Sequence, residues 1–308
     1  MMSIGWIFGL LTALSGMTLA SSNQQNGRSH VQATLLANVN AIVPGKAFTV
    51  GVLLHMQPGW HIYWKNSGDA GLPTEVHWRL PRGFTASELK WPAPQRFAEE
   101  AGIVTFGYAG ETMLIAEITP PSHLKNGEEI VLNAGVKWLE CDQVCIPGKA
   151  EVSLKLPVGT HAEPDSEDVF AKYSAMLPRD AIKADGLKVR SSAFKAAQPK
   201  EKLVAVLNLS IAADKWLVAN GKNLSRLEFF SEAMECCAVE RIEYPEPKEL
   251  RRSDKDVLHV YQGSVDISVV MKSFGMDATV PDKVRGVLVA QLLDGTGKAM
   301  PVQYLQIQ

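Results

Sequence analysis

Short runs of alternating apolar and polar residues recur along this chain from Gln32 onward, and they constrain the fold more than any other feature. Successive side chains of a β-strand point to opposite faces, so a period of two predicts strands with one buried face. Pro, Gly, Asn and Asp separate the runs about every ten residues, a spacing typical of an antiparallel sandwich. The runs before residue 157 are ATLLANV, AFTVGVLLHM, WHIYW, TEVHWRL, TMLIAEI, EIVLNAGVKWL and AEVSLKL. The sequence therefore predicts an all-β fold.

The pattern is interrupted once, by the polar and acidic stretch LPVGTHAEPDSED, after which DVFAKYSAMLPRD predicts one short helix. We expect residues 160–179 to be a linker with this helix. The alternation then resumes in GLKVRSS, KLVAVLNLSI, KNLSRLEFF, VLHVYQGSV, KVRGVLVAQLLD and PVQYLQI. This predicts a first β-sandwich over residues 21–159 and a second, sandwich-like β-domain over residues 180–308.

The N-terminus predicts export. An apolar run from Ile4 to Ala20 ends abruptly at Ser, Asn and Gln, which is typical of a signal peptide over residues 1–20 cleaved after Ala20. No Lys or Arg precedes the apolar run, which leaves an uncleaved membrane anchor as the alternative. Both alternatives place the rest of the chain outside the cytoplasm.

The charges exclude one class of partner. The chain has 31 basic and 33 acidic residues, a net charge of −2, with no sustained basic stripe to neutralise a phosphate backbone. We therefore expect no nucleic-acid partner. The four cysteines of an exported chain can form disulfides, yet domains of this size form a core without them. The cysteines therefore indicate a role beyond bulk stability.

Cys141 and Cys145 lie four positions apart. On one straight strand they would be about 13 Å apart, whereas the Cβ atoms of a disulfide lie about 3.8 Å apart. The chain must turn between them, and Asp142–Val144 can supply a three-residue hairpin loop that sets the two cysteines opposite each other. A bridge that closes so small a ring removes little chain entropy, and its exposed position favours reduction. Redox exchange is the preferred interpretation; an inert structural disulfide and metal binding are the alternatives, and we expect no metal or other cofactor.

The run WHIYW separates two kinds of side chain. Alternation places Trp60, Ile62 and Trp64 on one face and His61 and Tyr63 on the other. The three large apolar groups favour the core. His61 and Tyr63 then face solvent or line a site.

Four ordered motifs resemble a known family: PGWHIYWKNSGDAGLPTEVHW, KWPAPQRF, VTFGYAGE and VKWLECDQVCIPGKAEVSLKLP. Together, from about Gln32 to Gly159, they resemble the periplasmic N-terminal domain of the DsbD thiol–disulfide reductases, especially the ScsB-like form. The resemblance implies an immunoglobulin-like sandwich and a periplasmic location. It also implies a component of a protein-disulfide reductase, one that takes electrons from a membrane-embedded donor of the DsbD type and passes them to periplasmic thioredoxin-like proteins, in cytochrome c biogenesis or disulfide isomerisation.

The resemblance also implies residue roles. Cys145 would form the mixed disulfide with partners, and Cys141 would resolve it. His61 and Tyr63 would line the site. Phe106-Gly107-Tyr108 corresponds to a cap loop whose aromatic rings shield the pair.

Two features depart from the family pattern. Members usually continue into a membrane domain and a thioredoxin-like domain, whereas this sequence stops at Gln308, so we expect a separate membrane protein to supply electrons. The adjacent Cys236 and Cys237 could form a vicinal disulfide, bind Cu(I), or place one side chain in the core and one outside, which strand alternation favours. The competing hypotheses are thus a cell-envelope binding or scaffold protein with an inert bridge, and a copper-handling protein that uses Cys236 and Cys237.

Overall fold

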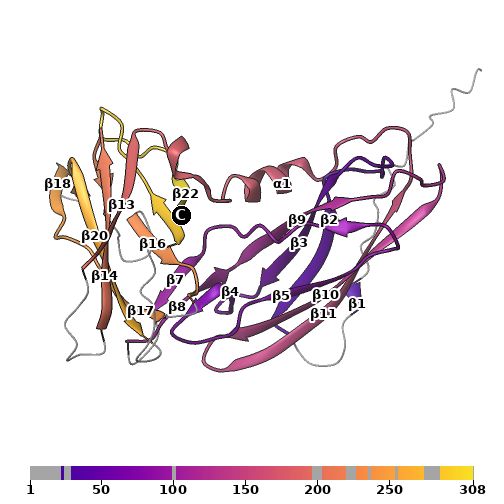
Figure 1. The fold of residues 1–308 in the computed structure, drawn as a ribbon, viewed down its shortest axis with the longest axis horizontal. Helices are drawn as coiled ribbons and strands as arrows, with labels where there is room; N and C mark the ends of the chain where they lie inside the picture. The colour runs from indigo at the N-terminus through magenta and orange to yellow at the C-terminus, as the bar shows by residue number, and fades with distance from the viewer. Residues whose placement is uncertain are drawn as a thin grey trace, which may run out of the picture.

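The computed structural model describes residues 22–23, 29–98, 102–195, 203–219, 227–234, 237–253, 256–273 and 285–307. The predicted signal peptide and Cys236 lie outside these residues. The described chain is built of β-strands with one α-helix and a short 3-10 turn, which confirms the predicted all-β class (Figure 1). The predicted domain boundaries at residues 159 and 180 stay a prediction.

The N-terminal sandwich, as we name the sheets of β1–β11, has two antiparallel sheets. The larger follows the order β1-β11-β10-β4-β8-β7 with β5 also on β10, and the smaller follows β2-β3-β9-β6. Its strands are β1 (Ser22–Asn23), β2 (Val31–Ala37), β3 (Phe48–Met56), β4 (His61–Gly68), β5 (Glu75–Arg79), β6 (Thr85–Ala86), β7 (Gln95–Ala98), β8 (Val104–Ala109), β9 (Glu111–Thr119), β10 (Glu129–Cys141) and β11 (Cys145–Pro157). This is the immunoglobulin-like architecture that the sequence predicts.

Alternation explains how these strands build the core. Along β2 every second residue, from Val31 to Ala37, is buried, and the residues between them are half-buried or exposed. In β10, Leu132, Ala134 and Val136 are buried in the same core. One face of each sheet therefore packs inward, as the period of two predicts.

Helix α1 (Glu167–Ser174) follows the N-terminal sandwich and runs over its smaller sheet. Its buried Phe170 and Tyr173 pack against Met113 and Ile115 of β9. The Tyr173 hydroxyl and the Lys172 ammonium both donate to a carboxylate oxygen of Glu111, at 2.7 and 3.0 Å. The short helix expected between the two β-rich parts is thus docked on the first of them.

The remaining strands form the C-terminal sheets, with the orders β12-β22-β21-β16, β13-β14-β20-β17 and β15-β19-β18. These strands are β12 (Arg179–Asp180), β13 (Leu187–Lys195), β14 (Leu203–Ala213), β15 (Leu217–Val218), β16 (Leu227–Ser231), β17 (Cys237–Glu243), β18 (Lys248–Ser253), β19 (Asp256–Tyr261), β20 (Ser264–Ser273), β21 (Gly286–Ala290) and β22 (Gln303–Ile307), and η2 spans Ala181–Lys183. Their own core includes Ile211, Ile267 and Val269.

Strands β16 and β21 are buried on both faces. Phe229 and Leu288 point into the core of the C-terminal sheets, whereas Phe230, Val287 and Val289 belong to the core of the N-terminal sandwich. Their sequences LEFFS and GVLVA are accordingly fully buried runs without alternation. The two halves of the chain therefore share packed side chains.

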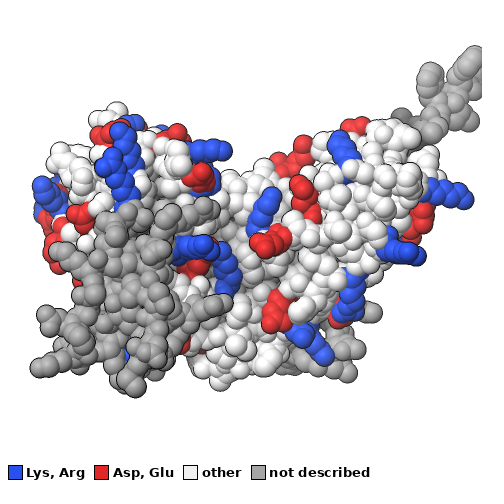
Figure 2. Space-filling view, in the orientation of Figure 1, with Lys and Arg blue, Asp and Glu red and all other residues white. Residues whose placement is uncertain are grey.

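The surface carries no dominant charge on the face that Figure 2 displays, where basic and acidic side chains are interspersed. No helix among the described residues is long and apolar enough to span a membrane.

Candidate functional site: the cysteine hairpin

Strands β10 and β11 form one long antiparallel hairpin, and its tip carries the cysteines. Cys141 pairs with Cys145 in register, and the Asp142 amide donates to the Val144 carbonyl at 3.2 Å across the three-residue loop. The two cysteines are joined by a disulfide, with their Cα atoms 4.2 Å apart. The predicted hairpin is therefore confirmed.

The two sulfurs have different surroundings. Cys141 ends a central strand beside His61 of β4 and is 2% exposed. Cys145 begins the outer arm of the hairpin and is exposed, as are the loop residues Asp142 and Gln143. A thiol reagent or a partner cysteine can therefore reach Cys145 directly, and Cys141 is covered.

Tyr63 covers the buried sulfur. Its side chain is 1% exposed, and its hydroxyl donates a hydrogen bond to Cys141 Sγ at 3.0 Å, with Cys145 Sγ at 3.8 Å. Gly71 in the loop after β4 packs directly against the ring, because a Cβ added there would overlap the ring carbons of Tyr63. Gly71 also has φ +97°, a conformation that favours glycine. The tyrosine is thus fixed between a glycine and the sulfur.

His61 lies beside Tyr63 on the same face of β4. It is 7% exposed, its ring meets the Tyr63 ring edge-on at 5.3 Å, and the ring of Phe97 in β7 stacks on it at 4.6 Å. The side chains that alternation places opposite the core therefore lie under cover next to the disulfide, not in open solvent.

A buried carboxylate anchors the end of β10 from the other face. Glu140 is 1% exposed and accepts hydrogen bonds from Ser29 Oγ at 3.0 Å, the His30 amide at 3.0 Å and Trp138 Nε1 at 2.8 Å. His30 Nδ1 lies 3.2 Å from the same carboxylate, and its ring stacks on Trp60 at 3.7 Å. A buried carboxylate is stable only when it is satisfied in this way, so the network fixes the strand that carries Cys141.

Residues 32–157 match the family described as thiol:disulfide interchange protein DsbD, N-terminal. This segment belongs to the DsbD N-terminal domain family. The chain is also similar to the crystal structure of the N-terminal periplasmic domain of ScsB from Proteus mirabilis, with a TM-score of 0.56 and 18% identity over 92% of this chain and 95% of that one. At this identity the likeness shows a shared fold, which extends over both halves of the chain.

Two further solved structures are less similar. The YadV chaperone has a TM-score of 0.21 and 10% identity over 89% of this chain and 99% of that one. The CsuC–CsuE chaperone–tip adhesin complex from Acinetobacter baumannii has a TM-score of 0.20 and 14% identity over 89% and 98%. TM-scores this low do not indicate a shared fold. No curated protein sequence matches the chain.

The stretch Phe106-Gly107-Tyr108 differs from its expected role as a cap loop over the cysteine pair. The predicted cap loop is wrong, because Phe106-Gly107-Tyr108 lies inside strand β8. Tyr108 pairs with Ile62 and its hydroxyl donates to the Pro92 carbonyl at 2.7 Å, whereas Gly107 pairs with Tyr63. Paired residues share a face, so Phe106 and Tyr108 point to the core and away from the sulfurs. Burial raises the pKa of the Tyr108 hydroxyl well above its usual value.

Sequence reasoning did not find Phe97, Glu140 or His30. Glu140 had a local signal, because it shares the predicted core face of β10 with Trp138 and Val136, where a charged residue requires partners. Phe97 had none, since only strand pairing brings β7 beside β4 through β8.

The second pair of cysteines is described only in part. Cys237 is 1% exposed in the core of the C-terminal sheets and is disulfide-bonded, and Cys236 lies outside the described residues. Within the described part of the chain, no group of three or more His, Cys, Asp or Glu side chains is arranged to hold a metal ion.

Proposed function

We propose that this protein is an exported, periplasmic thiol–disulfide exchange module whose reacting groups are Cys141 and Cys145. The observation that carries the proposal is the unequal exposure of the two sulfurs at one hairpin tip. The match of residues 32–157 to the family described as thiol:disulfide interchange protein DsbD, N-terminal, supports the proposal.

The exchange proceeds in two successive steps. The Cys145 thiolate attacks one sulfur of a partner disulfide, forms a mixed disulfide and releases the partner's other cysteine as a thiolate. The Cys141 thiolate then attacks Cys145 Sγ, which closes the Cys141–Cys145 disulfide and releases the partner's second thiolate. Two electrons pass to the partner, and the protons of the two cysteines pass to the released thiolates through solvent. A membrane-embedded dithiol donor of the DsbD type then reduces the pair again by the same chemistry.

The surface around Cys145 suits a thioredoxin-like partner. Among the described residues, Val144 and Ile146 beside it are 61% and 39% exposed, and Leu72 in the loop against Tyr63 is 64% exposed. Exposed large apolar side chains near a reactive group are typical of a docking surface. His61 and Tyr63 would line this site from beneath.

Trapping tests the roles of the two cysteines. Cys141→Ser is expected to accumulate mixed disulfides with an oxidised thioredoxin-like protein, because Cys145 can attack and nothing resolves the product. Cys145→Ser is the matched control and should accumulate few, since Cys141 is buried. Mixed disulfides formed mainly through Cys141 would contradict this assignment.

The reduction potential separates exchange from a structural bridge. A couple that exchanges with periplasmic thioredoxin-like proteins is expected above about −300 mV, whereas inert structural disulfides lie below that value. The measurement is equilibration of the wild-type pair with glutathione or dithiothreitol, read by alkylation and mass spectrometry. A much lower potential would favour a scaffold protein with an inert bridge.

A further inference from the structure

The strands that carry the cysteine site have a second face, and the C-terminal sheets pack against it. Cys141, His61 and Ala109 pair in one row across β10, β4 and β8, and the next row is Glu140, Ile62 and Tyr108. Side chains of successive rows point to opposite faces. The sulfurs therefore lie on one face of this sheet, and Ile62 and Tyr108 lie on the other, in the core.

Phe230 of β16 is the centre of the contact on the core face. It is fully buried, and its ring packs edge-on against Trp64 of β4 and Phe106 of β8, with ring centroids 6.4 and 5.2 Å away. Val287 and Val289 of β21 complete the same cluster. Aromatic edge-to-face pairs of this kind add stability beyond the apolar area that they bury.

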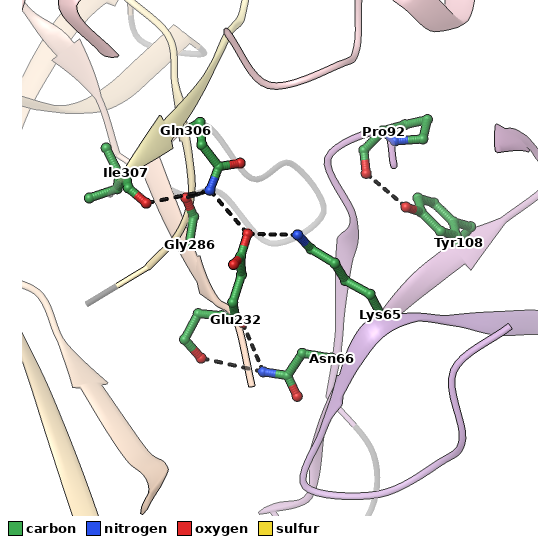
Figure 3. A network of polar contacts seen from close by, with 9 residues as sticks. Lys65, Asn66, Pro92, Tyr108, Glu232, Gly286, Gln306 and Ile307 are labelled. Atoms are coloured by element: carbon green, nitrogen blue, oxygen red, sulfur yellow. Dashed lines mark hydrogen bonds and ion pairs between the residues drawn. The ribbon is translucent and has the colours of Figure 1, made fainter. Parts of the chain in front are cut away.

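Polar contacts also join β4 to the C-terminal sheets (Figure 3). Lys65 Nζ donates to Glu232 at 2.6 Å, and Asn66 Nδ2 donates to the Ser231 carbonyl at 2.8 Å. Gln306 of β22 also donates to the Glu232 carboxylate, at 3.0 Å. These groups are partly exposed, and ion pairs of that kind contribute little, so the buried rings carry most of the contact.

Strand β7 is linked to this contact through β8. It lies at the edge of its sheet, and among the described residues β8 is its paired strand. Its residues line a groove together with Val239 and Arg241 of β17. Phe97 of β7 stacks on His61, and the neighbouring Arg96 faces Glu228 of β16 at 3.9 Å. Contacts on the core face of β8 and β7 therefore also fix Phe97, which covers His61 on the opposite face.

We infer that Phe230 is a positioning residue of the redox site: through Trp64 and Phe106 it fixes β4 and β8, and thereby holds Tyr63 against Cys141 and Phe97 against His61. This rests on the proposed exchange function and assigns a role in it to the C-terminal sheets. The reacting atoms remain the two sulfurs, and Phe230 acts on them through the sheet between.

The test is a reaction that needs no protein partner. Reduced protein reacts with an aromatic disulfide reagent and releases one coloured thiolate when Cys145 attacks and a second when Cys141 resolves the mixed disulfide. Phe230→Ala is expected to slow the second release by about tenfold, because small displacements of reacting groups have large effects on intramolecular rates. Val289→Ala removes less volume from the same cluster and should slow it to a smaller degree.

Leu288→Ala is the matched control. Leu288 neighbours both valines on β21 and is fully buried, but it points into the core of the C-terminal sheets. It should lower the melting temperature as Phe230→Ala does and leave the second release unchanged. Equal slowing in the Leu288 and Phe230 variants, or no slowing in Phe230→Ala, would overturn the inference. If Phe230→Ala does not fold, the comparison of Val289→Ala with Leu288→Ala decides in the same way.

Failure of the Phe230 inference can be distinguished from failure of the proposed function. A wild-type pair that reacts with the small reagent but never with thioredoxin-like proteins would contradict the proposed partner class. The effect of Phe230 on the small reagent would still be readable in that case.

Discussion

Tyr63 contacts both sulfurs of the cysteine pair through its hydroxyl. Its hydroxyl is buried and donates to Cys141 Sγ, and hydrogen bonds to a charged acceptor are stronger than those to a neutral one. In the reduced protein, a hydrogen bond from this hydroxyl would stabilise the thiolate form of Cys141, which is the form that attacks Cys145 in the proposed resolving step. Cys145, which is exposed, depends on it less.

We predict that Tyr63→Phe slows the resolving step by about tenfold, which corresponds to the loss of roughly 1.4 kcal/mol from a hydrogen bond to a charged group. The two-phase release of thiolate from an aromatic disulfide reagent measures this. The first phase, attack by Cys145, should hardly change. Tyr108→Phe is the control, because it removes a buried tyrosine hydroxyl from the opposite face of the sheet. It should lower stability by about 1 kcal/mol and leave both phases unchanged; slowing in both variants would contradict a specific role of Tyr63.

At the scale of elements, helix α1 is held on β9 by a small polar network. Hydrogen bonds from the Tyr173 hydroxyl and the Lys172 ammonium lower the pKa of the Glu111 carboxyl below its usual value. The same network, Tyr173 first, raises the pKa of Lys172. A carboxyl with a lowered folded-state pKa adds stability at pH values above its ordinary pKa, and this stability is lost as the pH falls through the folded-state pKa.

We predict that Tyr173→Phe lowers the melting temperature by about 2 °C at neutral pH. The difference in melting temperature between the variant and the wild type should shrink as the pH falls below the ordinary carboxyl range. Glu111 is then protonated in both proteins, so the wild type no longer has the charged acceptor for the Tyr173 hydrogen bond. Thermal unfolding between acid and neutral pH measures it. A difference that stays constant with pH would show that the ring packing of Tyr173, and not the carboxylate, is affected.

At the scale of the whole molecule, the two halves share one of their cores. Phe230, Val287 and Val289 come from the C-terminal sheets and are buried among residues of the N-terminal sandwich. Shared apolar burial of this kind couples the stability of the units on either side. The chain should therefore not unfold as two independent bodies.

We predict that Val287→Ala costs about 2 kcal/mol and lowers the protection of amides in β4 and β8 as well as in β21. Native-state hydrogen exchange measures this. Val269→Ala in β20 is the control, because Val269 is fully buried in the separate core of the C-terminal sheets. It should reduce protection in β14 and β20 far more than in β4. Equal loss in β4 from both variants would argue against the shared cluster as the route of coupling.

The sequence by itself determined the features that depend on local pattern. Period-two alternation predicted most strands and placed His61 and Tyr63 on the face opposite the core, and the reach of a disulfide required a turn between Cys141 and Cys145. Each of these follows from neighbouring residues and fixed backbone geometry. The ordered motifs were enough to indicate the DsbD-type domain.

Only the tertiary structure decided which segments meet. The stretch Phe106-Gly107-Tyr108 was expected to be a loop over the sulfurs, yet as part of β8 it is paired with β4, and this pairing turns both rings into the core. Phe97 reaches His61 and Phe230 reaches Trp64 through contacts between residues far apart in the chain. The physical reason is that a strand's own period fixes which of its side chains share a face, whereas the choice of neighbouring strand and opposing sheet depends on packing of the whole chain.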